Sequence, residues 1–292
     1  MNASRQTVWS QDNLANPHAV ADKAQRVRRM FAAIAPSYDL NNRLHSLGRD
    51  QAWRRAAVRM AEVKPTDVVL DVACGTGDLS LAFADAGAAR VIGVDFTFEM
   101  LPIARAKSQG PRAKSEGPRA KGQGPSNLPS TLGPRPSALH PRPSTLGPAY
   151  HAGDAMRLPL ADASVDVVSI AFGIRNVADP AAALREFHRV LRPGGRLVIL
   201  EFGLPTSALL RRLYLFYFRH ILPRTAALIA RDRTGAYKYL PQSVSTFIDR
   251  AAMLDIMGRS GFAESIAKPL TFGVALVYRG VKRQDGAHPC CS

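Results

Sequence analysis

The stretch VVLDVACGTGDLSLAF, residues 68–83, runs from apolar residues through a glycine turn into residues with apolar side chains at helical spacing. This order is typical of a buried strand, a tight turn and a helix, in which the turn can approach a ligand through its backbone. Gly75, Thr76 and Gly77 match the dinucleotide fingerprint only in part. The turn therefore indicates a nucleotide-type cofactor without specifying which one.

The charges around this turn narrow the choice of cofactor. Asp71 ends the expected strand and Asp78 begins the expected helix, and we expect no Lys or Arg nearby to compensate them. A pyrophosphate prefers the positive end of a helix, so two carboxylates would repel it. S-adenosylmethionine carries an ammonium and a sulfonium, which the same carboxylates would attract, and its ribose would suit Asp95 after the next strand. Asp78 could also be a helix cap alone.

A second segment supports the same cofactor. GDAMRLPLADASVDVV, residues 153–168, places Asp154 and Ala155 after an expected third strand. The carboxylate of Asp154 can accept the adenine amino hydrogens, and Ala155 can supply a backbone N–H. A polar loop above a buried pair of leucines explains this segment equally well.

The rest of the chain alternates between apolar strands and helices, which predicts an α/β fold with a mostly parallel sheet covered on both faces. Residues 26–60 have a helical pattern with a break at 35–42, and Asp179 with Pro180 begins another helix. The expected strands include 90–95, 165–172, 194–202 and a final, edge-side strand at 273–282.

Residues 108–148 interrupt this pattern. They contain nine Pro and six Gly, and they repeat GPRAK and PSTLGP. Such a composition cannot bury enough apolar surface to offset its ordering entropy, so we expect a disordered surface insertion. The pattern resumes directly afterwards, which favours one domain over 26–283 with disordered ends at 1–25 and 284–292.

The composition limits the classes of partner. The net charge is +16 and the pI is about 10.5, but seven of the basic residues fall in 107–148, so nucleic-acid binding is not expected. The three cysteines, Cys74, Cys290 and Cys291, lack metal-ligand spacing, and no metal site is expected. Without a signal peptide or a long apolar run, the chain reads as cytoplasmic. Residues 209–231 mix apolar side chains with arginines, which suits peripheral membrane contact, core packing or a homodimer interface.

Several longer segments resemble one known family. They are DVACGTGD, GDAMRLPL, FGIRNVADPAAALREFHRVLRPGGRLVILEF and YKYLPQSV, together with MFAAIAPSYDLNNRLHSLGRDQAWRR near the N-terminus. In this order they resemble the ubiquinone/menaquinone biosynthesis C-methyltransferases over residues 26–283, except for the insertion. The resemblance implies a class I methyltransferase fold with a seven-stranded sheet and a helical cap over the strand ends. It also implies methyl transfer from S-adenosylmethionine to a ring carbon of a polyprenylated hydroquinone.

The resemblance carries over to individual residues. It places Thr76, Asp95, Asp154 and Ala155 at cofactor-contact positions, and Ala171 stands where the family often has Ser, which removes a hydroxyl. The long insertion is not part of the family pattern.

Two further pairs of residues are candidates for acceptor chemistry. Arg175 and Asn176 follow a strand, where ligands bind in open α/β folds, so we expect Arg175 to hold a developing oxyanion and Asn176 to orient a ring oxygen. An ion pair between Arg175 and Asp179 is the alternative. Tyr38 and Asp39 are expected as substrate-binding lid residues, with packing as the alternative.

Three other functions stay open from the sequence. They are a methyltransferase acting on another small molecule, a non-catalytic nucleic-acid-binding protein, and a dehydrogenase.

Overall fold

Seven strands form one sheet in a computed structural model that describes residues 8–9, 11–46, 48–110, 147–221 and 235–284. The spatial order is β3-β2-β1-β4-β5-β7-β6, and β7 alone runs in the direction opposite to the other six strands. The strands are β1 (Val68–Val72), β2 (Arg90–Asp95), β3 (Ala149–Ala152), β4 (Val165–Ala171), β5 (Leu191–Phe202), β6 (Phe262–Leu270) and β7 (Ala275–Lys282). This is the mostly parallel, seven-stranded sheet that the resemblance implied.

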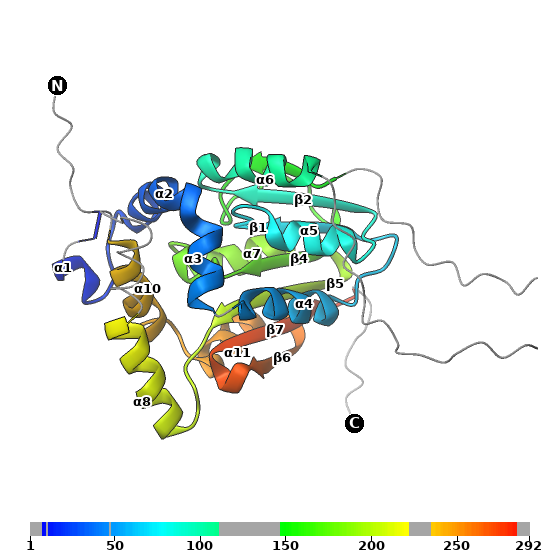
Figure 1. Ribbon diagram of the computed structural model, residues 1–292. Coiled ribbons are helices and arrows are strands. Elements are labelled where there is room, and N and C mark those ends of the chain that lie inside the picture. The colour runs from blue at the N-terminus through cyan, green and yellow to red at the C-terminus, as the bar shows by residue number, and fades with distance from the viewer. Residues whose placement is uncertain (1–7, 10, 47, 111–146, 222–234, 285–292) are drawn as a thin grey trace, which may run out of the picture.

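Helices cover both faces of the sheet and one end of it (Figure 1). The helices are α1 (Gln11–Leu14), α2 (Lys23–Ile34), α3 (Tyr38–His45), α4 (Arg49–Ala61), α5 (Asp78–Asp85), α6 (Leu101–Gln109), α7 (Pro180–Val190), α8 (Ala208–Phe216), α10 (Ala236–Ser245) and α11 (Arg250–Arg259). Short 3-10 turns at Ala35–Ser37, Phe98–Met100, Ile174–Asn176 and Thr271–Gly273 and a π-helical turn at Tyr217–Ile221 connect some of them.

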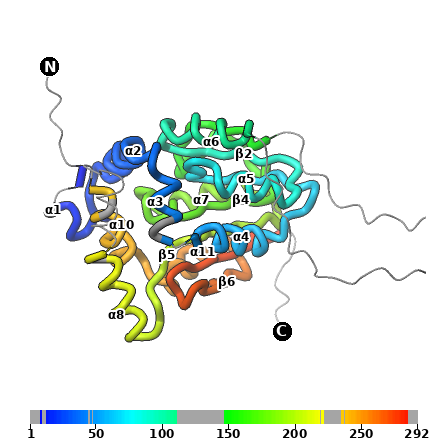
Figure 2. The backbone as a smooth tube through the Cα atoms, viewed as in Figure 1, coloured from blue at the N-terminus to red at the C-terminus, as the bar shows by residue number. Residues whose placement is uncertain are grey.

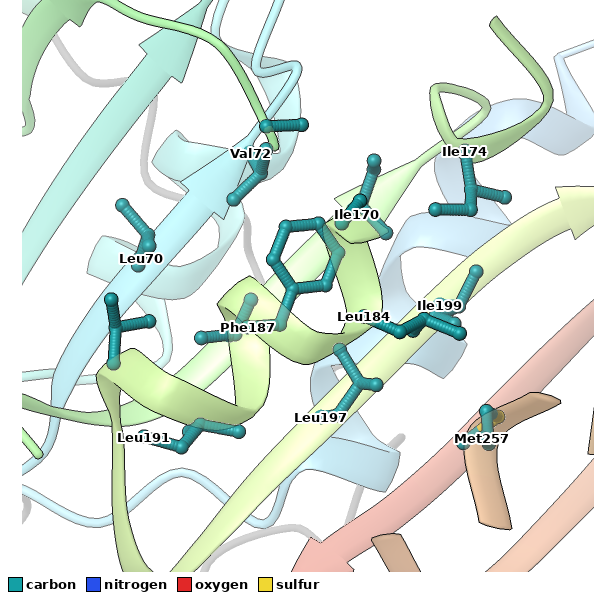
Figure 3. Packing of buried hydrophobic residues seen from close by; sticks show 14 of the residues in the cluster. Leu70, Val72, Ile170, Ile174, Leu184, Phe187, Leu191, Leu197, Ile199 and Met257 are labelled. Carbon is teal, nitrogen blue, oxygen red and sulfur yellow. The ribbon is translucent and has the colours of Figure 1, made fainter. Parts of the chain in front are cut away.

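The strands are apolar throughout because alternate side chains enter two different cores. On β1, Leu70 and Val72 pack with α7 and α11, whereas Val69 packs with α4 and α5 on the opposite face. Figure 3 shows the first of these cores, with Phe187 of α7 among residues of β1, β4 and β5. A strand buried on both faces has no polar side to expose, which explains the continuous apolar runs in the sequence.

A third, smaller core joins the cap of helices at one end of the sheet. Figure 2 shows the N-terminal helices α1 and α2 beside α10, although about two hundred residues separate them in the chain. Trp9 stacks on Tyr239 with ring centroids 4.4 Å apart, and Leu14 and Met30 are buried in the same cluster. The expectation of disorder through residue 25 is therefore wrong for residues 8–9 and 11–25, because their apolar side chains pack against α10.

The C-terminal strands correct a second expectation. The stretch 273–282 was expected at the edge of the sheet, but β7 lies between β5 and β6. Residues 275–278 are buried on both faces, which suits an interior strand, whereas β6 alternates between exposed and half-buried residues and carries Pro269. Charges and a proline are typical of an edge strand. Most of the predicted insertion, 111–146, and residues 285–292 of the predicted tail lie outside the described residues.

Candidate functional site

A cleft with an empty volume of about 800 Å³ lies at the carboxyl ends of β1, β2, β3 and β4. The strand order changes direction between β1 and β4, and open α/β sheets bind ligands at this switch point. Six of the predicted site residues line the cleft: Gly75, Asp95, Asp154, Ala155 and Asn176 from the sheet side, and Tyr38 from the cap.

The glycine turn approaches the cleft because its backbone adopts conformations that favour glycine. Gly75 and Gly77 have φ values of 54° and 85°. A Cβ on Gly77 would lie 2.5 Å from the hydroxyl of Tyr150, so a side chain there would displace β3. Gly77 therefore shapes the turn from behind and does not itself line the cleft.

Asp95 connects the turn to the end of β2. Its two carboxylate oxygens accept backbone N–H bonds from Gly75 and Thr97, each at 2.7 Å. Burial raises the pKa of Asp95 to about 6, although these N–H donors oppose the shift. A carboxylate can accept about four hydrogen bonds, so the positions that Gly75 and Thr97 leave can accept a hydrogen bond from a hydroxyl of a bound ribose.

Asp154 and Ala155 lie in the loop after β3. The carboxylate of Asp154 accepts the N–H of Met156 at 2.9 Å, which fixes its orientation at the cleft. Ala155 is buried beside the apolar core, and Met156 lines the cleft next to it. The segment thus offers an apolar surface with one carboxylate, as a purine with an amino group requires.

Asp71 and Thr76 lie on the other side of the turn, in a small cavity of about 310 Å³ that also touches Gly75. The hydroxyl of Ser80 donates to Asp71 at 2.6 Å, which ties the end of β1 to α5. Burial raises the pKa of Asp71 to about 7. Asp71 therefore braces the strand and the helix from behind the turn.

A lysine compensates the acids at the turn, contrary to the sequence-based expectation. The ammonium of Lys107, on α6, lies 2.5 Å from Asp39 and 2.7 Å from Asp78, and it donates to Thr76 at 3.1 Å. The Thr76 hydroxyl also donates to Asp39 at 2.6 Å. Burial alone would raise the pKa of Asp78, but Arg54 and Lys107 hold it below its usual value. The argument that uncompensated carboxylates repel a pyrophosphate is therefore wrong. The network instead anchors the cap helix α3 to the glycine turn and to α5 and α6.

A second cavity, with an empty volume of about 910 Å³, adjoins the cleft on the side of the cap. We call it the ring chamber. Its walls are mostly aromatic and apolar, and include Trp53, Phe202, Tyr214, Phe218 and Tyr239. Phe31, Tyr38 and Phe172 line both cavities. A planar apolar group in the chamber would thus meet a ligand in the cleft at a shared wall.

Arg175 lies in the wall of this chamber. Its guanidinium pairs with Glu201 at 2.6 Å and donates to the carbonyl of Phe172 at 2.7 Å, and both charged side chains are buried. The alternative of an ion pair with Asp179 is wrong, because Asp179 caps α7 through the N–H groups of Ala181 and Ala182. Arg175 is a buried cation held in place by the next strand.

Asn176 faces the cleft from the same turn. Its amide donates to the carbonyl of Phe172 at 3.2 Å, and its oxygen accepts the hydroxyl of Tyr239 at 2.9 Å. Phe172 itself has a φ of 56°, a conformation that is costly for a bulky residue. Its N–H donates to Leu200 at 2.7 Å, so three hydrogen bonds hold this backbone.

Sequence reasoning missed Lys107, Glu201 and Tyr239. Each lies far along the chain from its partner, and no local spacing could have paired them. One signal was available in the sequence. Glu201 lies at the end of a largely apolar strand, and a carboxylate buried there needs a charged or hydrogen-bonding partner.

Within the residues described, no group of three or more His, Cys, Asp or Glu side chains could hold a metal ion. None of the helices described is long and apolar enough to cross a membrane.

Comparison with known proteins identifies close relatives of the chain. Residues 19–116 and 147–282 match the ubiE/COQ5 methyltransferase family. A demethylmenaquinone methyltransferase from Deinococcus radiodurans is 41% identical over 263 residues, which cover 90% of this chain and 95% of the relative. A ubiquinone/menaquinone biosynthesis C-methyltransferase UbiE from Geobacter sp. (strain M21) is 40% identical over 267 residues, 91% of this chain and 100% of the relative.

The fold has solved counterparts. A SAM-dependent methyltransferase from Thermotoga maritima superposes with a TM-score of 0.53 at 18% identity, and the match covers 88% of this chain and 100% of that one. At this identity the likeness concerns the fold alone, and it agrees with the class I methyltransferase architecture expected above.

Proposed function

We propose that this chain, which belongs to the ubiE/COQ5 methyltransferase family, methylates a ring carbon of a polyprenylated quinol in menaquinone or ubiquinone biosynthesis. The observation that carries the proposal is the pair of adjoining cavities with a shared wall. Methyl transfer requires donor and acceptor to meet directly, and an aromatic chamber beside a cofactor cleft suits a quinol ring. The family match speaks against the dehydrogenase and nucleic-acid alternatives.

S-adenosylmethionine is the methyl donor and supplies an electrophilic methyl group on a positively charged sulfur. Asp95 would accept the ribose hydroxyls, and Asp154 with the N–H of Ala155 would hold the adenine. Gly75, Thr76 and Gly77 would bring the turn beside the cofactor, with Asp71 bracing it. The cleft suits these contacts because it is lined mostly by apolar surface, with a few polar groups that can fix the orientation of the cofactor.

The acceptor ring must become a strong carbon nucleophile. A quinol hydroxyl resembles that of Tyr, with an ordinary pKa near 10, so the site must favour its deprotonated form. The buried guanidinium of Arg175 would stabilise the developing oxyanion, and water would take the proton. Asn176, held by Tyr239, would orient a ring oxygen. Tyr38 would contact the ring at the shared wall, and Asp39 would hold Tyr38 there through its bonds to the turn.

The relative positioning of the quinol ring and the methyl donor would supply the rest of the rate enhancement. A ring and a donor held against one wall avoid the entropic cost of meeting, a contribution of roughly 7–11 kcal/mol in well-oriented reactions. The aromatic walls of the chamber fit this role because they position a planar ring by stacking.

Helix α8 is the candidate for contact with a membrane that stores the substrate. Leu209, Leu213 and Phe216 are each more than half exposed, and Arg211 and Arg212 are exposed beside them. Apolar side chains with neighbouring arginines suit an interface with anionic lipid. Flotation with anionic but not neutral vesicles would support this contact, and a homodimer over the same face would instead appear in sedimentation. Residues 222–231 of the predicted segment lie outside the described residues.

Mass spectrometry of the reaction products tests the proposed function. The purified chain is incubated with S-adenosylmethionine and reduced naphthoquinols or benzoquinols that carry an isoprenoid tail and lack the ring methyl. We expect one methyl on a ring carbon, and no product from the oxidised quinone, whose ring is electron-poor. Transfer to oxygen, or to no quinol at all, would contradict the proposal. The preferred ring would distinguish the two pathways.

A further inference from the structure

Two buried polar atoms in the ring chamber have no hydrogen-bond partner among the described residues. They are Nε of Arg175 and the hydroxyl of Tyr214. Most buried polar atoms in folded proteins are satisfied, because leaving one without a partner costs stability. Two such atoms in one ligand-sized cavity point to a ligand that satisfies both.

The two atoms belong to different parts of the fold. Arg175 lies in the 3-10 turn after β4 and is fixed by Glu201 and by the Phe172 carbonyl. Tyr214 lies on α8, where its ring stacks on Phe218 with centroids 4.8 Å apart and planes 24° apart. Stacking fixes the phenol ring without using its hydroxyl. The hydroxyl is therefore held in place and available.

The hydroxyl of Tyr214 is a donor at neutral pH. Burial raises the pKa of Tyr214, and the opposing effect of the nearby Arg175 charge is smaller. A protonated phenol can donate one hydrogen bond and accept others, whereas Arg175 can only donate. Both groups can thus donate to oxygen.

We propose that Tyr214 donates a hydrogen bond to one ring oxygen of the acceptor while Arg175 holds the other, so that the chamber selects rings with two oxygen substituents. The inference rests on the proposed function, because it assigns the acceptor to this chamber. Tyr214 is thereby a specificity-determining residue. A site built to bond a substrate hydroxyl rejects an analogue without it, since the protein group is then left buried and unpaired.

The variant Tyr214→Phe removes the hydroxyl and keeps the stacked ring. The full chain and its variant are compared on a quinol and on the matched ring that lacks one hydroxyl. We expect the wild type to prefer the quinol and the variant to lose this preference, with KM for the quinol raised roughly three- to tenfold. The KM for the monohydroxy ring should stay unchanged. The Tm of the variant should stay equal or rise, because an unpaired buried hydroxyl is removed.

Tyr150→Phe is the matched control. Its hydroxyl already has a partner, Ser108 at 3.1 Å, and lies outside the chamber. We expect this variant to lose some thermal stability and to keep the preference for the quinol. The two variants therefore separate a hydroxyl that bonds the protein from one that bonds a ligand.

Two results would overturn the inference. One is unchanged discrimination by Tyr214→Phe, and the other is a lowered Tm with equal losses on both rings, which indicates a structural role. Failure of the wild type to methylate any quinol would contradict the proposed function instead. Ring binding, followed by the fluorescence of Trp53 in the chamber wall, would still report on Tyr214 in that case.

Discussion

The cofactor cleft and the ring chamber share a wall, yet different parts of the chain build them. The cleft consists mainly of loops that follow β1 to β4, so the hydrogen-bonded sheet fixes their positions. The chamber consists mainly of the cap helices α2, α3, α8 and α10, together with α4 from one face of the sheet. Loops on a rigid sheet can hold one cofactor in many enzymes, while a helical cap can vary with the acceptor. The difference suggests that the two cavities can be perturbed separately.

The largest effect is expected from replacing Arg175. This substitution should impair the function of the ring chamber and leave ligand binding in the cleft unchanged. Arg175→Met should lower turnover roughly 100- to 1,000-fold, as removal of an oxyanion donor does. It also leaves Glu201 buried and unpaired, at a cost of about 3–5 kcal/mol of unfolding free energy. Methyl-transfer rates, denaturant unfolding and titration with S-adenosylhomocysteine measure the three effects. Affinity for this product should change little.

The double variant Arg175→Met with Glu201→Gln is the control for that experiment. It removes the unpaired charge, so most of the lost stability should return while turnover stays low. Recovery of turnover together with stability would show that Arg175 only supports the fold.

Asp95→Asn should have the opposite effect, because it should impair ligand binding in the cleft and leave the ring chamber unchanged. Loss of the carboxylate should weaken S-adenosylhomocysteine binding roughly 10- to 100-fold, because hydrogen bonds to charged groups contribute more than neutral ones. The binding of a quinol ring in the chamber should be unaffected. Calorimetric titration of both ligands measures the contrast, and a variant that binds the product as tightly as the wild type would contradict the role of Asp95.

The pH dependence of S-adenosylhomocysteine binding provides a second test of the role of Asp95. The pKa of Asp95 is raised to about 6, so its carboxylate is ionised above this pH and protonated below it. Wild-type affinity for the product should therefore fall as the pH is lowered through about 6. The amide that Asp95→Asn introduces does not titrate, so the curve of this variant should lack the step.

Lys107 connects the two regions, and its loss should have a smaller effect. Lys107→Met removes an ammonium that lies between Asp39 and Asp78. Partly exposed ion pairs contribute about 1 kcal/mol or less, so product affinity should fall roughly two- to fivefold. Amide exchange in α3 should become faster, because the helix loses its anchor. Lys107→Arg should retain most of the function, and Lys268→Met, on the exposed edge strand β6, is the matched control. Unchanged exchange in α3 would contradict the anchoring role.

The smallest effect on ligand binding is expected from replacing residues 111–146 with a short Gly/Ser linker. The elements on either side of this segment, α6 and β3, already contact each other. Arg105 donates to the Tyr150 carbonyl at 2.8 Å, and the Ser108 hydroxyl forms a hydrogen bond with the Tyr150 hydroxyl. A shorter loop loses less entropy on closure, so stability should rise by about 1 kcal/mol. Product affinity should not change. A calorimetric scan and a titration measure both, and loss of cofactor binding would show that the segment belongs to the site.

The same division explains what the sequence could predict. The positions of Asp95, Asp154 and Ala155 at the cleft could be predicted, because each lies at or just after the end of a strand that its apolar run identifies. The chamber could not, because Tyr214 and Tyr239 reach it from helices whose mutual packing has no local pattern. Lys107 was missed for the same reason, and the charge argument at the turn failed with it. β7 was misplaced because an interior antiparallel strand and an edge strand differ in their neighbours more than in their residues.

The left-handed backbone of Phe172 has a consequence for engineering this enzyme. Glycine at that position would relieve a conformational cost of about 1–3 kcal/mol, but it would also remove a buried aromatic side chain, a loss of about 3–5 kcal/mol in a folded core. The same substitution would open the wall that the cleft and the ring chamber share. Mutant libraries designed to raise thermostability should therefore leave Phe172 unchanged, and their variants should be selected for turnover as well as for stability.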